Sequence, residues 1–409
     1  MKILHIYREK NKGQIGGVEY HIKYLAQQQQ KLGLIPSVMT YSLSNRDYLT
    51  VENRNGIDWY LLEIKDPIYK IAQQLKGFES GGLGFTITPF DRIRQNFRIS
   101  KKLNLIKDIH PDIIHQHDYL SSVRLSKKIS KKFMIIFTNH YGEYLFLKKT
   151  KITRYLQQRF LAHFNAIIAP SLNLLPSQNN SYFIPNGFDT DGFREIGSNE
   201  KLKLKTEQGL EKKVVFLCAR RWAPTKGVLY LAKALNLLSD DIKQKSVFLF
   251  AGNDAEDFPI YRKQVQAELD QSVGVDFRLY GNVDHDGLIP LINISDIGVI
   301  PSLMEGMSLF SIELISCGIP VLATDVGGLP EIIKTNENGW LVPQKNAQKI
   351  AEEITRIVSN WPGTNLPIKT LEFRKKYSWE SIAQQTLEIY KNINKHENIS
   401  RHRNKTRSN

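Results

Sequence analysis

Short apolar runs alternate with amphipathic stretches along the first half of the chain. The runs have the length of strands, and between them apolar residues recur every three or four positions, as in helices that cover a sheet. The expected strands are 3–7, 36–41, 112–117, 133–139, 166–170 and 181–185, and the first expected helix is 18–33. Strands that alternate with helices in this way predict a parallel sheet with helices on both faces.

A second series of the same kind follows a polar, lysine-rich stretch at 195–210, which we interpret as a hinge. Its expected strands are 213–219, 246–251, 277–280, 297–300, 320–323 and 339–342, and its expected helices are 228–238, 261–273, 287–294 and 308–317. A chain of 409 residues is too long for one ordinary core. The sequence therefore predicts an α/β protein of two Rossmann-like domains.

The predicted boundaries follow from these two series. The first domain is expected at 1–190 and the second at 191–376. A segment at 377–395 contains one further helix, at 379–391, and the basic end of the chain, 396–409, is expected to be a disordered tail.

Composition changes this picture little. Hydrophobic residues make up 41% of the chain and charged residues 24%, as in globular domains. The short apolar run at the N-terminus is interpreted as a first strand and not as a signal peptide. No apolar stretch reaches the roughly 18–20 residues of a membrane helix. Both cysteines, Cys218 and Cys317, are expected in the core, without a disulfide or a metal. We therefore expect a cytoplasmic protein.

The net charge of +15 requires an explanation. Basic residues gather at 92–107, at 127–132 and near the end of the chain. No nucleic-acid-binding motif accompanies them, so we expect no nucleic-acid partner. Phe90, Ile93 and Phe97 share a helix face opposite several charges, which favours a peripheral approach to an anionic membrane. An ordinary solvated surface is the alternative.

The segment 301–331 carries the strongest chemical signal. Glu305 and Glu313 stand eight positions apart across a helix start, so their side chains should point to roughly the same side. Between them Gly306, Met307 and Ser308 offer unpaired backbone N–H groups at the positive end of the helix. Carboxylates that bind hydroxyls beside an anion-binding helix end suit a nucleotide sugar.

With this Glu-x7-Glu spacing the chain resembles the group 4 family of retaining glycosyltransferases, which have the GT-B fold. The resemblance extends from the first strand to about Tyr390. It implies two Rossmann-like domains that face each other across a cleft, and a C-terminal helix that crosses back to the first domain. It also implies transfer of a hexosyl group from a nucleotide-diphosphate sugar to a glycan or lipid-linked acceptor, in cell-envelope or exopolysaccharide biosynthesis, with no cofactor beyond the donor.

Two cations form the next signal. Arg221 and Lys226 lie five residues apart in a loop that follows a strand and opens a helix, where they can bracket a diphosphate. In the family the matching arginine and lysine hold the donor phosphates. The family usually has glycine at the position of Arg220, so the sequence leaves open whether Arg220 or Arg221 meets the phosphates.

Several glycine loops are assigned to the donor. Gly16 and Gly17 join a strand to a helix, where backbone can approach a ligand closely, although a plain tight turn is equally compatible with the local sequence. The resemblance places this loop over the donor phosphate. It also implies a base and ribose pocket lined by Gly252, Asn282 and Val283.

The resemblance gives the glutamates different partners. Glu313 would accept hydrogen bonds from the ribose, and Glu305 would hold hydroxyls of the transferred sugar. The backbone N–H groups that bind the nucleotide-sugar donor would come from Gly306, Met307, Ser308 and Leu309.

Three histidines follow strands of the first domain. His115 and His117 alternate to one face beside Asp118, and His140 ends the next strand. No further cysteine or histidine lies at a suitable spacing, so zinc is not expected. The resemblance implies that His140 contacts the donor sugar and helps align the leaving group. We assign His117 and Asp118 to the acceptor side.

The predicted catalytic residues are thus His140, Arg221, Lys226 and Glu305. The Asp189-Thr190-Asp191 sequence imitates a metal-binding motif, but it lies in a turn after the last strand of the first domain, so no metal is expected. The resemblance implies a front-face displacement in which the leaving phosphate helps deprotonate the acceptor. Two other functions stay open: a different nucleotide-sugar enzyme, such as an epimerase, and a non-catalytic binding protein on the same fold.

Overall fold

The computed structural model describes residues 1–8, 16–69, 89–118, 122–140, 151–252, 258–363 and 366–405, with backbone only at 89–92 and 396–405. Its contacts divide the chain into two compact units. Unit 1 comprises the described residues of 1–187 and the C-terminal helix from Trp379 onward, and unit 2 comprises Phe188–Ser378.

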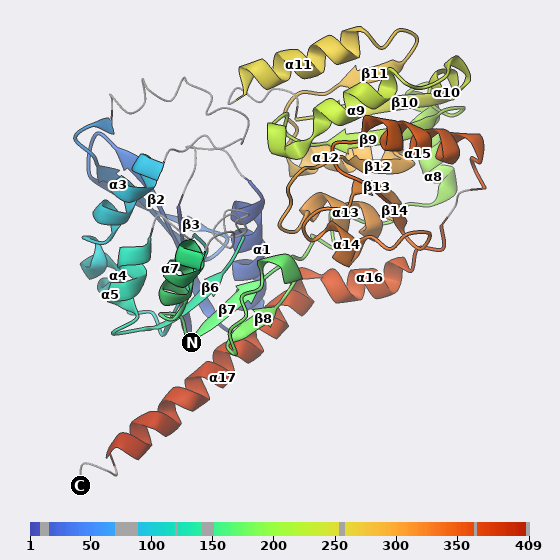
Figure 1. The fold of residues 1–409 in the computed structure, drawn as a ribbon. Helices are drawn as coiled ribbons and strands as arrows, with labels where there is room; N and C mark the ends of the chain where they lie inside the picture. Colours follow the sequence, from blue (N-terminus) through green and yellow to red (C-terminus); the bar gives the residue numbers. More distant parts are fainter. Residues whose placement is uncertain are drawn as a thin grey trace. The chain divides into compact units, whose positions relative to one another are not determined.

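Unit 1 contains an eight-stranded sheet in the order β3-β4-β2-β1-β5-β6-β7-β8 (Figure 1). Its strands are β1 (Lys2–Arg8), β2 (Ile35–Ser44), β3 (Tyr48–Arg54), β4 (Ile57–Lys65), β5 (Ile113–Gln116), β6 (Met134–Thr138), β7 (Ala166–Ala169) and β8 (Ser181–Phe183). All neighbours are parallel except β3 and β4, which are antiparallel. This hairpin is not among the predicted strands, because its outer strand is mostly exposed and carries no apolar run.

Helices cover both faces of this sheet. They are α1 (Gly17–Lys31), α3 (Pro89–Ile99), α4 (Leu103–Ile109), α5 (Val123–Ile129), α7 (Lys151–Leu161) and α17 (Trp379–Lys405). Alternate residues of β1 pack on opposite faces of the sheet. Leu4 and Ile6 lie in a core with residues of α3, α4 and α5. Tyr7 lies in the core on the other face, with Ile22 of α1. α17 packs against α1 within the same unit.

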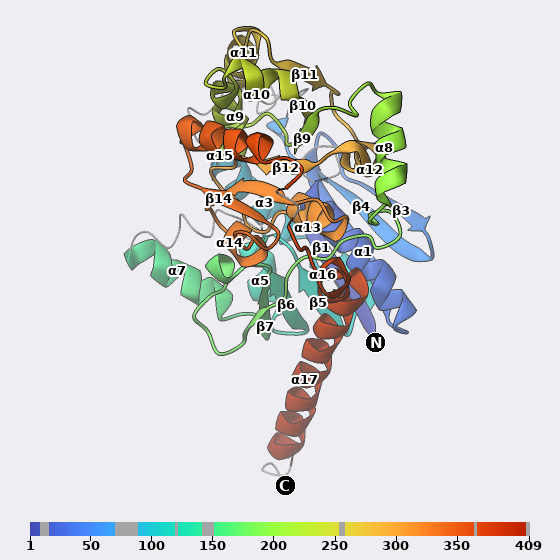
Figure 2. The ribbon, with the colours of Figure 1, turned by 90° about the vertical axis from the view of Figure 1, so that its right-hand side faces the viewer.

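Unit 2 contains a six-stranded parallel sheet in the order β11-β10-β9-β12-β13-β14. Its strands are β9 (Val214–Ala219), β10 (Ser246–Ala251), β11 (Asp276–Leu279), β12 (Ile297–Ile300), β13 (Val321–Thr324) and β14 (Gly339–Val342). Its helices are α8 (Ser198–Glu207), α9 (Val228–Leu235), α10 (Asp240–Lys245), α11 (Pro259–Asp270), α12 (His285–Ile294), α13 (Leu309–Ser316), α14 (Leu329–Ile332), α15 (Ala347–Ser359) and α16 (Thr370–Tyr377) (Figure 2). Apart from the edge strand β11, the strands are largely buried on both faces, which explains their continuous apolar runs.

The predicted alternation of strands and helices is confirmed in both units, but the hinge interpretation of 195–210 is wrong. This stretch forms helix α8, and the two units divide between Gly187 and Phe188. Lys201 and Lys205 of α8 bind Asp296 at 3.0 and 2.7 Å. Ion pairs therefore attach this helix to unit 2, and its hydrophobic pattern is correspondingly weak.

The end of the chain also differs from the expected tail. Helix α17 continues to Lys405, because nothing in 396–405 interrupts a helical backbone: the stretch has neither glycine nor proline. Both cysteines are buried and free, as expected. Among the described helices, none is long and apolar enough to cross a membrane.

Candidate functional site

The loops of unit 2 that carry predicted site residues follow parallel strands, so they lie at one edge of the sheet. Backbone hydrogen bonds join these loops. The N–H of Gly252 donates to the carbonyl of Gly281 at 2.6 Å, and the N–H of Trp222 donates to the carbonyl of Gly252 at 3.0 Å. A Cβ on Gly252, whose φ is +88°, would come within 2.8 Å of the Arg220 backbone, so the close approach requires glycine.

The loop that carries Glu305 is fixed from both sides. The N–H groups of Leu303 and Met304 donate to the carbonyl of Thr225 at 2.9 and 3.2 Å. On the other side, the hydroxyl of Thr324 donates to the carbonyl of Ser302 at 2.5 Å. These bonds place Glu305 beside the Pro224–Lys226 turn that precedes α9.

Three donors converge on one oxygen of Glu305. Its Oε1 accepts hydrogen bonds from Lys226 Nζ at 2.9 Å, from Ser302 Oγ at 2.8 Å and from the Arg220 guanidinium. The Glu305 side chain is 5% exposed and that of Lys226 is 26% exposed. Two cations on one carboxylate leave an excess of positive charge, which favours a further anion at this position.

Glu313 lies on α13, behind this cluster. Ser308 caps the helix by accepting from the N–H of Ser311 at 3.3 Å. Burial raises the pKa of Glu313 to about 8, although the nearby Arg220 acts in the opposite direction. Glu305 thus contacts Arg220 directly, and Arg220 lies near enough to Glu313 to influence its pKa.

The two neighbouring arginines point to different surroundings. The Arg220 side chain lies with Glu305, and burial lowers its pKa to about 10. The guanidinium of Arg221 lies over the Phe258 ring, 5.6 Å from its centroid. The structure thus brings Arg220 together with Lys226 and Glu305. Which arginine meets the phosphates stays a prediction, and this geometry favours Arg220.

The other residues assigned to the donor lie around this edge. Asn282 is exposed in the loop after β11, and Val283 is half-buried next to it. The Met307 side chain packs in the core of unit 2, so only the backbone of Met307 is available to a ligand. Asp189 accepts a hydrogen bond from the N–H of Asp191 at 3.1 Å, which is the expected turn.

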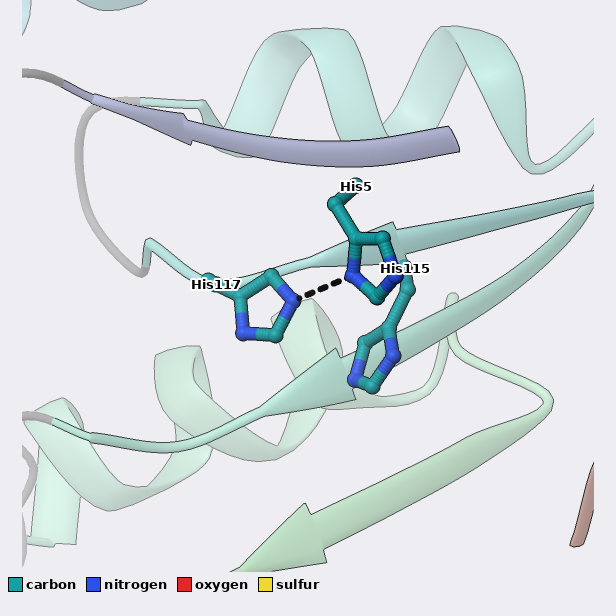
Figure 3. A group of neighbouring side chains, drawn as sticks. All are labelled: His5, His115 and His117. Atoms are coloured by element: carbon teal, nitrogen blue, oxygen red, sulfur yellow. Dashed lines mark hydrogen bonds between the residues drawn. The ribbon is translucent and has the colours of Figure 1, made fainter. Parts of the chain in front are cut away.

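In unit 1, five histidines gather where the sequence predicts three. His5 of β1 and His21 of α1 join His115, His117 and His140. Figure 3 shows His5, His115 and His117 with their rings close together at neighbouring strands, and a hydrogen bond of 3.0 Å between His5 Nδ1 and His117 Nε2.

This cluster shows what the spacing argument about metal missed. The ring nitrogens of His5, His115 and His117 lie within 4.8 Å of one another, as do those of His21, His117 and His140. The parallel register of β1 and β5 pairs His5 directly with His115, which is the signal that could have revealed the cluster. Hydrogen bonds join His117 to His5 and to His140, whereas His115 and His21 bond other residues, among them Tyr390 and Asn186.

The remaining predicted residues of unit 1 are engaged with neighbours. The buried carboxylate of Asp118 accepts a hydrogen bond from the Tyr41 hydroxyl at 2.6 Å. Gly16 is the N-cap of α1, and its N–H donates to Glu19 Oε2 at 3.0 Å, while Gly17 is the first residue of the helix. His140 is only partly buried, so it is the member of the cluster with the best access to a ligand.

Comparison with known proteins identifies the family. A model described as Glycosyltransferase Family 4 matches residues 15–191, and a model described as Glycosyl transferases group 1 matches residues 200–378. The chain belongs to this glycosyltransferase family. It is a retaining hexosyltransferase that uses a nucleotide sugar as donor. Its fold is GT-B, with two Rossmann-like units and the C-terminal helix α17 packed against α1.

Individual relatives of the enzyme are distant. An uncharacterized glycosyltransferase of Methanocaldococcus jannaschii is 25% identical over 96% of this chain and 98% of its own. The GPI3 subunit of phosphatidylinositol N-acetylglucosaminyltransferase from Saccharomyces cerevisiae is 24% identical over 93% of this chain and 80% of its own. The crystal structure of Anabaena HepE in complex with UDP and glucose has a TM-score of 0.71 at 16% identity, covering 96% and 100% of the two chains.

The raised pKa of Glu313 leads to a prediction about stability. The folded enzyme retains this proton up to about pH 8, whereas an unperturbed glutamate releases it near pH 4.5. The contribution of this group to stability is therefore lost as pH rises between these values, at a slope of up to about 1.4 kcal/mol per pH unit. Glu313→Gln should remove that slope in urea unfolding measured from pH 5 to 8.

A matched control is Glu337→Gln, which replaces an exposed carboxylate of the same unit. It should keep the pH dependence of the unsubstituted enzyme. Equal slopes for the enzyme and for Glu313→Gln would contradict a buried, protonated Glu313.

Proposed function

We propose that this enzyme transfers a hexosyl group from a nucleoside-diphosphate sugar to a hydroxyl of a glycan or lipid-linked acceptor. The observation that supports the site is the convergence of Arg220, Lys226 and Ser302 on Glu305 beside the N-terminus of α13. In this proposal the donor diphosphate binds the two cations, and the hydroxyls of the sugar bind Glu305. Glu313 binds the ribose.

The proposed reaction depends on charge stabilisation more than on acid–base chemistry. Negative charge develops on the departing diphosphate in the transition state. Fixed cations and helix N–H groups that face that charge lower the barrier without reorganising. Lys226 and Arg220 would supply the cations, and the backbone of Gly306 and Ser308 would supply N–H groups. His140 would contact the sugar.

We further propose that the acceptor is presented at an anionic membrane, at its cytoplasmic face. Helix α3 of unit 1 exposes two apolar side chains one turn apart, Ile93 at 56% and Phe97 at 51%. The Arg124 guanidinium lies 3.8 Å from the centroid of the Phe97 ring. Apolar groups with cations beside them match a surface of anionic lipid headgroups. The related GPI3 subunit belongs to an enzyme whose name includes a phosphatidylinositol lipid.

The function is tested by incubating the enzyme with UDP-, GDP- and ADP-linked sugars and an extract of glycan and lipid-linked acceptors. A covalently glycosylated product with the anomeric configuration of the donor is the expected result. An isomerised donor sugar would support the epimerase instead. Donor binding without turnover over a broad acceptor panel would support a binding protein.

Vesicle co-sedimentation tests the membrane contact separately. The enzyme should sediment with phosphatidylglycerol-containing vesicles and stay in solution with pure phosphatidylcholine. Ile93→Ser/Phe97→Ser should weaken the sedimentation several-fold without changing transfer to a water-soluble acceptor. Ile152→Ser on α7, whose side chain is 74% exposed, serves as the control. Equal sedimentation of the control and the α3 variant would contradict α3 as the contact.

A further inference from the structure

The histidines of unit 1 form a hydrogen-bonded chain that begins at the amide of Gln29. Gln29 lies on α1 and is fully buried. Its Oε1 is 2.8 Å from His5 Nε2, and His5 Nδ1 is 3.0 Å from His117 Nε2 (Figure 3). His117 Nδ1 is in turn 3.1 Å from His140 Nε2. The chain therefore runs from the interior to the partly exposed His140 at the end of β6.

With its oxygen facing His5, the Gln29 amide determines which nitrogen donates in each hydrogen bond of this series. An amide oxygen only accepts hydrogen bonds, so His5 Nε2 must carry a proton. Burial lowers the pKa of His5 to about 4, so its ring is neutral at pH 7 and its Nδ1 bears a lone pair. That lone pair accepts from Nε2–H of His117, and Nδ1 of His117 accepts from Nε2–H of His140 in the same way, since burial lowers the pKa of both rings well below 6.5. The other nitrogen of His140, Nδ1, is then an acceptor.

A second branch is consistent with this orientation of the amide. Gln29 Nε2 donates to the Tyr390 hydroxyl of α17 at 3.0 Å. The Tyr390 hydroxyl lies 2.6 Å from His115 Nδ1, and His115 Nε2 lies 2.6 Å from Thr138 Oγ1. With Tyr390 as the donor to His115 Nδ1, the neutral His115 ring donates its Nε2–H to Thr138. Burial raises the pKa of Tyr390, so its hydroxyl keeps the proton that this branch needs. In this arrangement each ring N–H of the two branches has one acceptor.

Within the described residues, no hydrogen bond of His5, His117 or His140 goes to a carboxylate that could stabilise an imidazolium. A carboxylate in the place of Gln29 could stabilise a protonated ring, as an aspartate does in a catalytic triad. An amide cannot accept a proton, so a proton that enters at His140 has no destination at the inner end.

We propose that Gln29 is a positioning residue, which holds His140 as a neutral hydrogen-bond acceptor for a hydroxyl of the donor sugar and not as a base in the transfer. This inference rests on the proposed function. In the transfer, the acceptor oxygen forms a bond to the anomeric carbon while the bond from that carbon to the diphosphate oxygen breaks. The bonding electrons leave with the diphosphate, and the hydroxyl proton goes to a diphosphate oxygen.

Nitrogen NMR of the histidine rings tests the tautomers without any substrate. In the full chain labelled with 15N-histidine, His5, His117 and His140 should each be protonated at Nε2 and bare at Nδ1 at pH 7. An imidazolium, or an Nδ1–H form of His117 or His140, would overturn the inference. So would stoichiometric Zn²⁺ that shifts these nitrogens, because the rings would then form a metal site. A failure here leaves the transfer function itself untouched.

Kinetics of Gln29 variants test the consequence. Gln29→Met removes both hydrogen bonds of the amide at similar volume and should lower kcat about tenfold, with little change in the KM for the donor. Gln29→Glu places a carboxylate beside His5, which raises the imidazole pKa. The pH profile of kcat for this variant should therefore show an ionisation between pH 5 and 8 that is absent from the profile of the unsubstituted enzyme.

The matched control is Gln30→Met, the exposed neighbour on the same helix, whose amide donates to the carbonyl of Gly56 at 3.2 Å. It should keep both the rate and the pH profile. Unchanged kcat in Gln29→Met, or an unchanged profile in Gln29→Glu, would overturn the inference. Thermal unfolding reports whether the variants are folded, and the ring spectrum of the unsubstituted enzyme decides the tautomers even if they are not.

Discussion

Lys226→Ala should lower the rate of glycosyl transfer by about 10²–10³-fold, which corresponds to about 3–4 kcal/mol of transition-state stabilisation. Lys226 Nζ lies 2.9 Å from Glu305 Oε1 at the edge of unit 2 where we place the donor diphosphate. The loss should fall mainly on kcat, since the charge on the leaving group is largest in the transition state. Steady-state kinetics with saturating acceptor measure it.

The fold should survive this substitution, because the Lys226 side chain is partly exposed on a short turn. Circular dichroism and urea unfolding check this. Lys212→Ala removes an exposed lysine of the same unit and controls for the change in net charge. Near-normal transfer by Lys226→Ala would remove the central assignment of the site.

Arg220→Met should reduce transfer by about 100-fold, whereas Arg221→Met should change it less than about threefold. The two variants lose the same charge and similar volume, so only position distinguishes them. Arg220 contacts Glu305, while Arg221 lies over the Phe258 ring. Single-turnover measurements separate loss of donor binding from loss of the chemical step.

A larger loss of transfer in Arg221→Met than in Arg220→Met would instead assign phosphate binding to Arg221, as the family pattern suggests. Arg220→Lys offers a further control, since it retains the charge but loses the planar fork that binds a carboxylate or phosphate. An intermediate rate is expected for it. The unfolding free energy of each variant must be compared, because Arg220 is a buried partner of Glu305.

The sequence predicts those parts of the site that short spacings determine. Glu305, Glu313 and Lys226 belong to single loop–helix segments, where the helical repeat decides which side chains share a face. Glu305 contacts Arg220 and Lys226, and Arg220 lies near enough to Glu313 to influence its pKa. The direction of Arg220 and Arg221 could not be predicted, since it depends on how the chain turns after β9 and on the Gly252 loop beside it.

Contacts between distant segments limit what the sequence predicts in unit 1. His5 joins His115 through the register of two strands, and Gln29 meets Tyr390 from the far end of the chain. No local pattern encodes such a pairing. The stretch 195–210 was misinterpreted for a similar reason: α8 is fixed by Lys201 and Lys205 through Asp296, which lies much later in the sequence.

The attachment of α17 to unit 1 has a consequence for synthesis of the enzyme. Tyr390 and Trp379 complete the surroundings of Gln29 and His21, but the ribosome makes them only after all of unit 2. While unit 2 is still being synthesised, Gln29 and His21 of unit 1 therefore lack α17, the helix that later packs against them. Premature termination anywhere in unit 2 yields a protein in which Gln29 and His115 lack their hydrogen bonds to Tyr390.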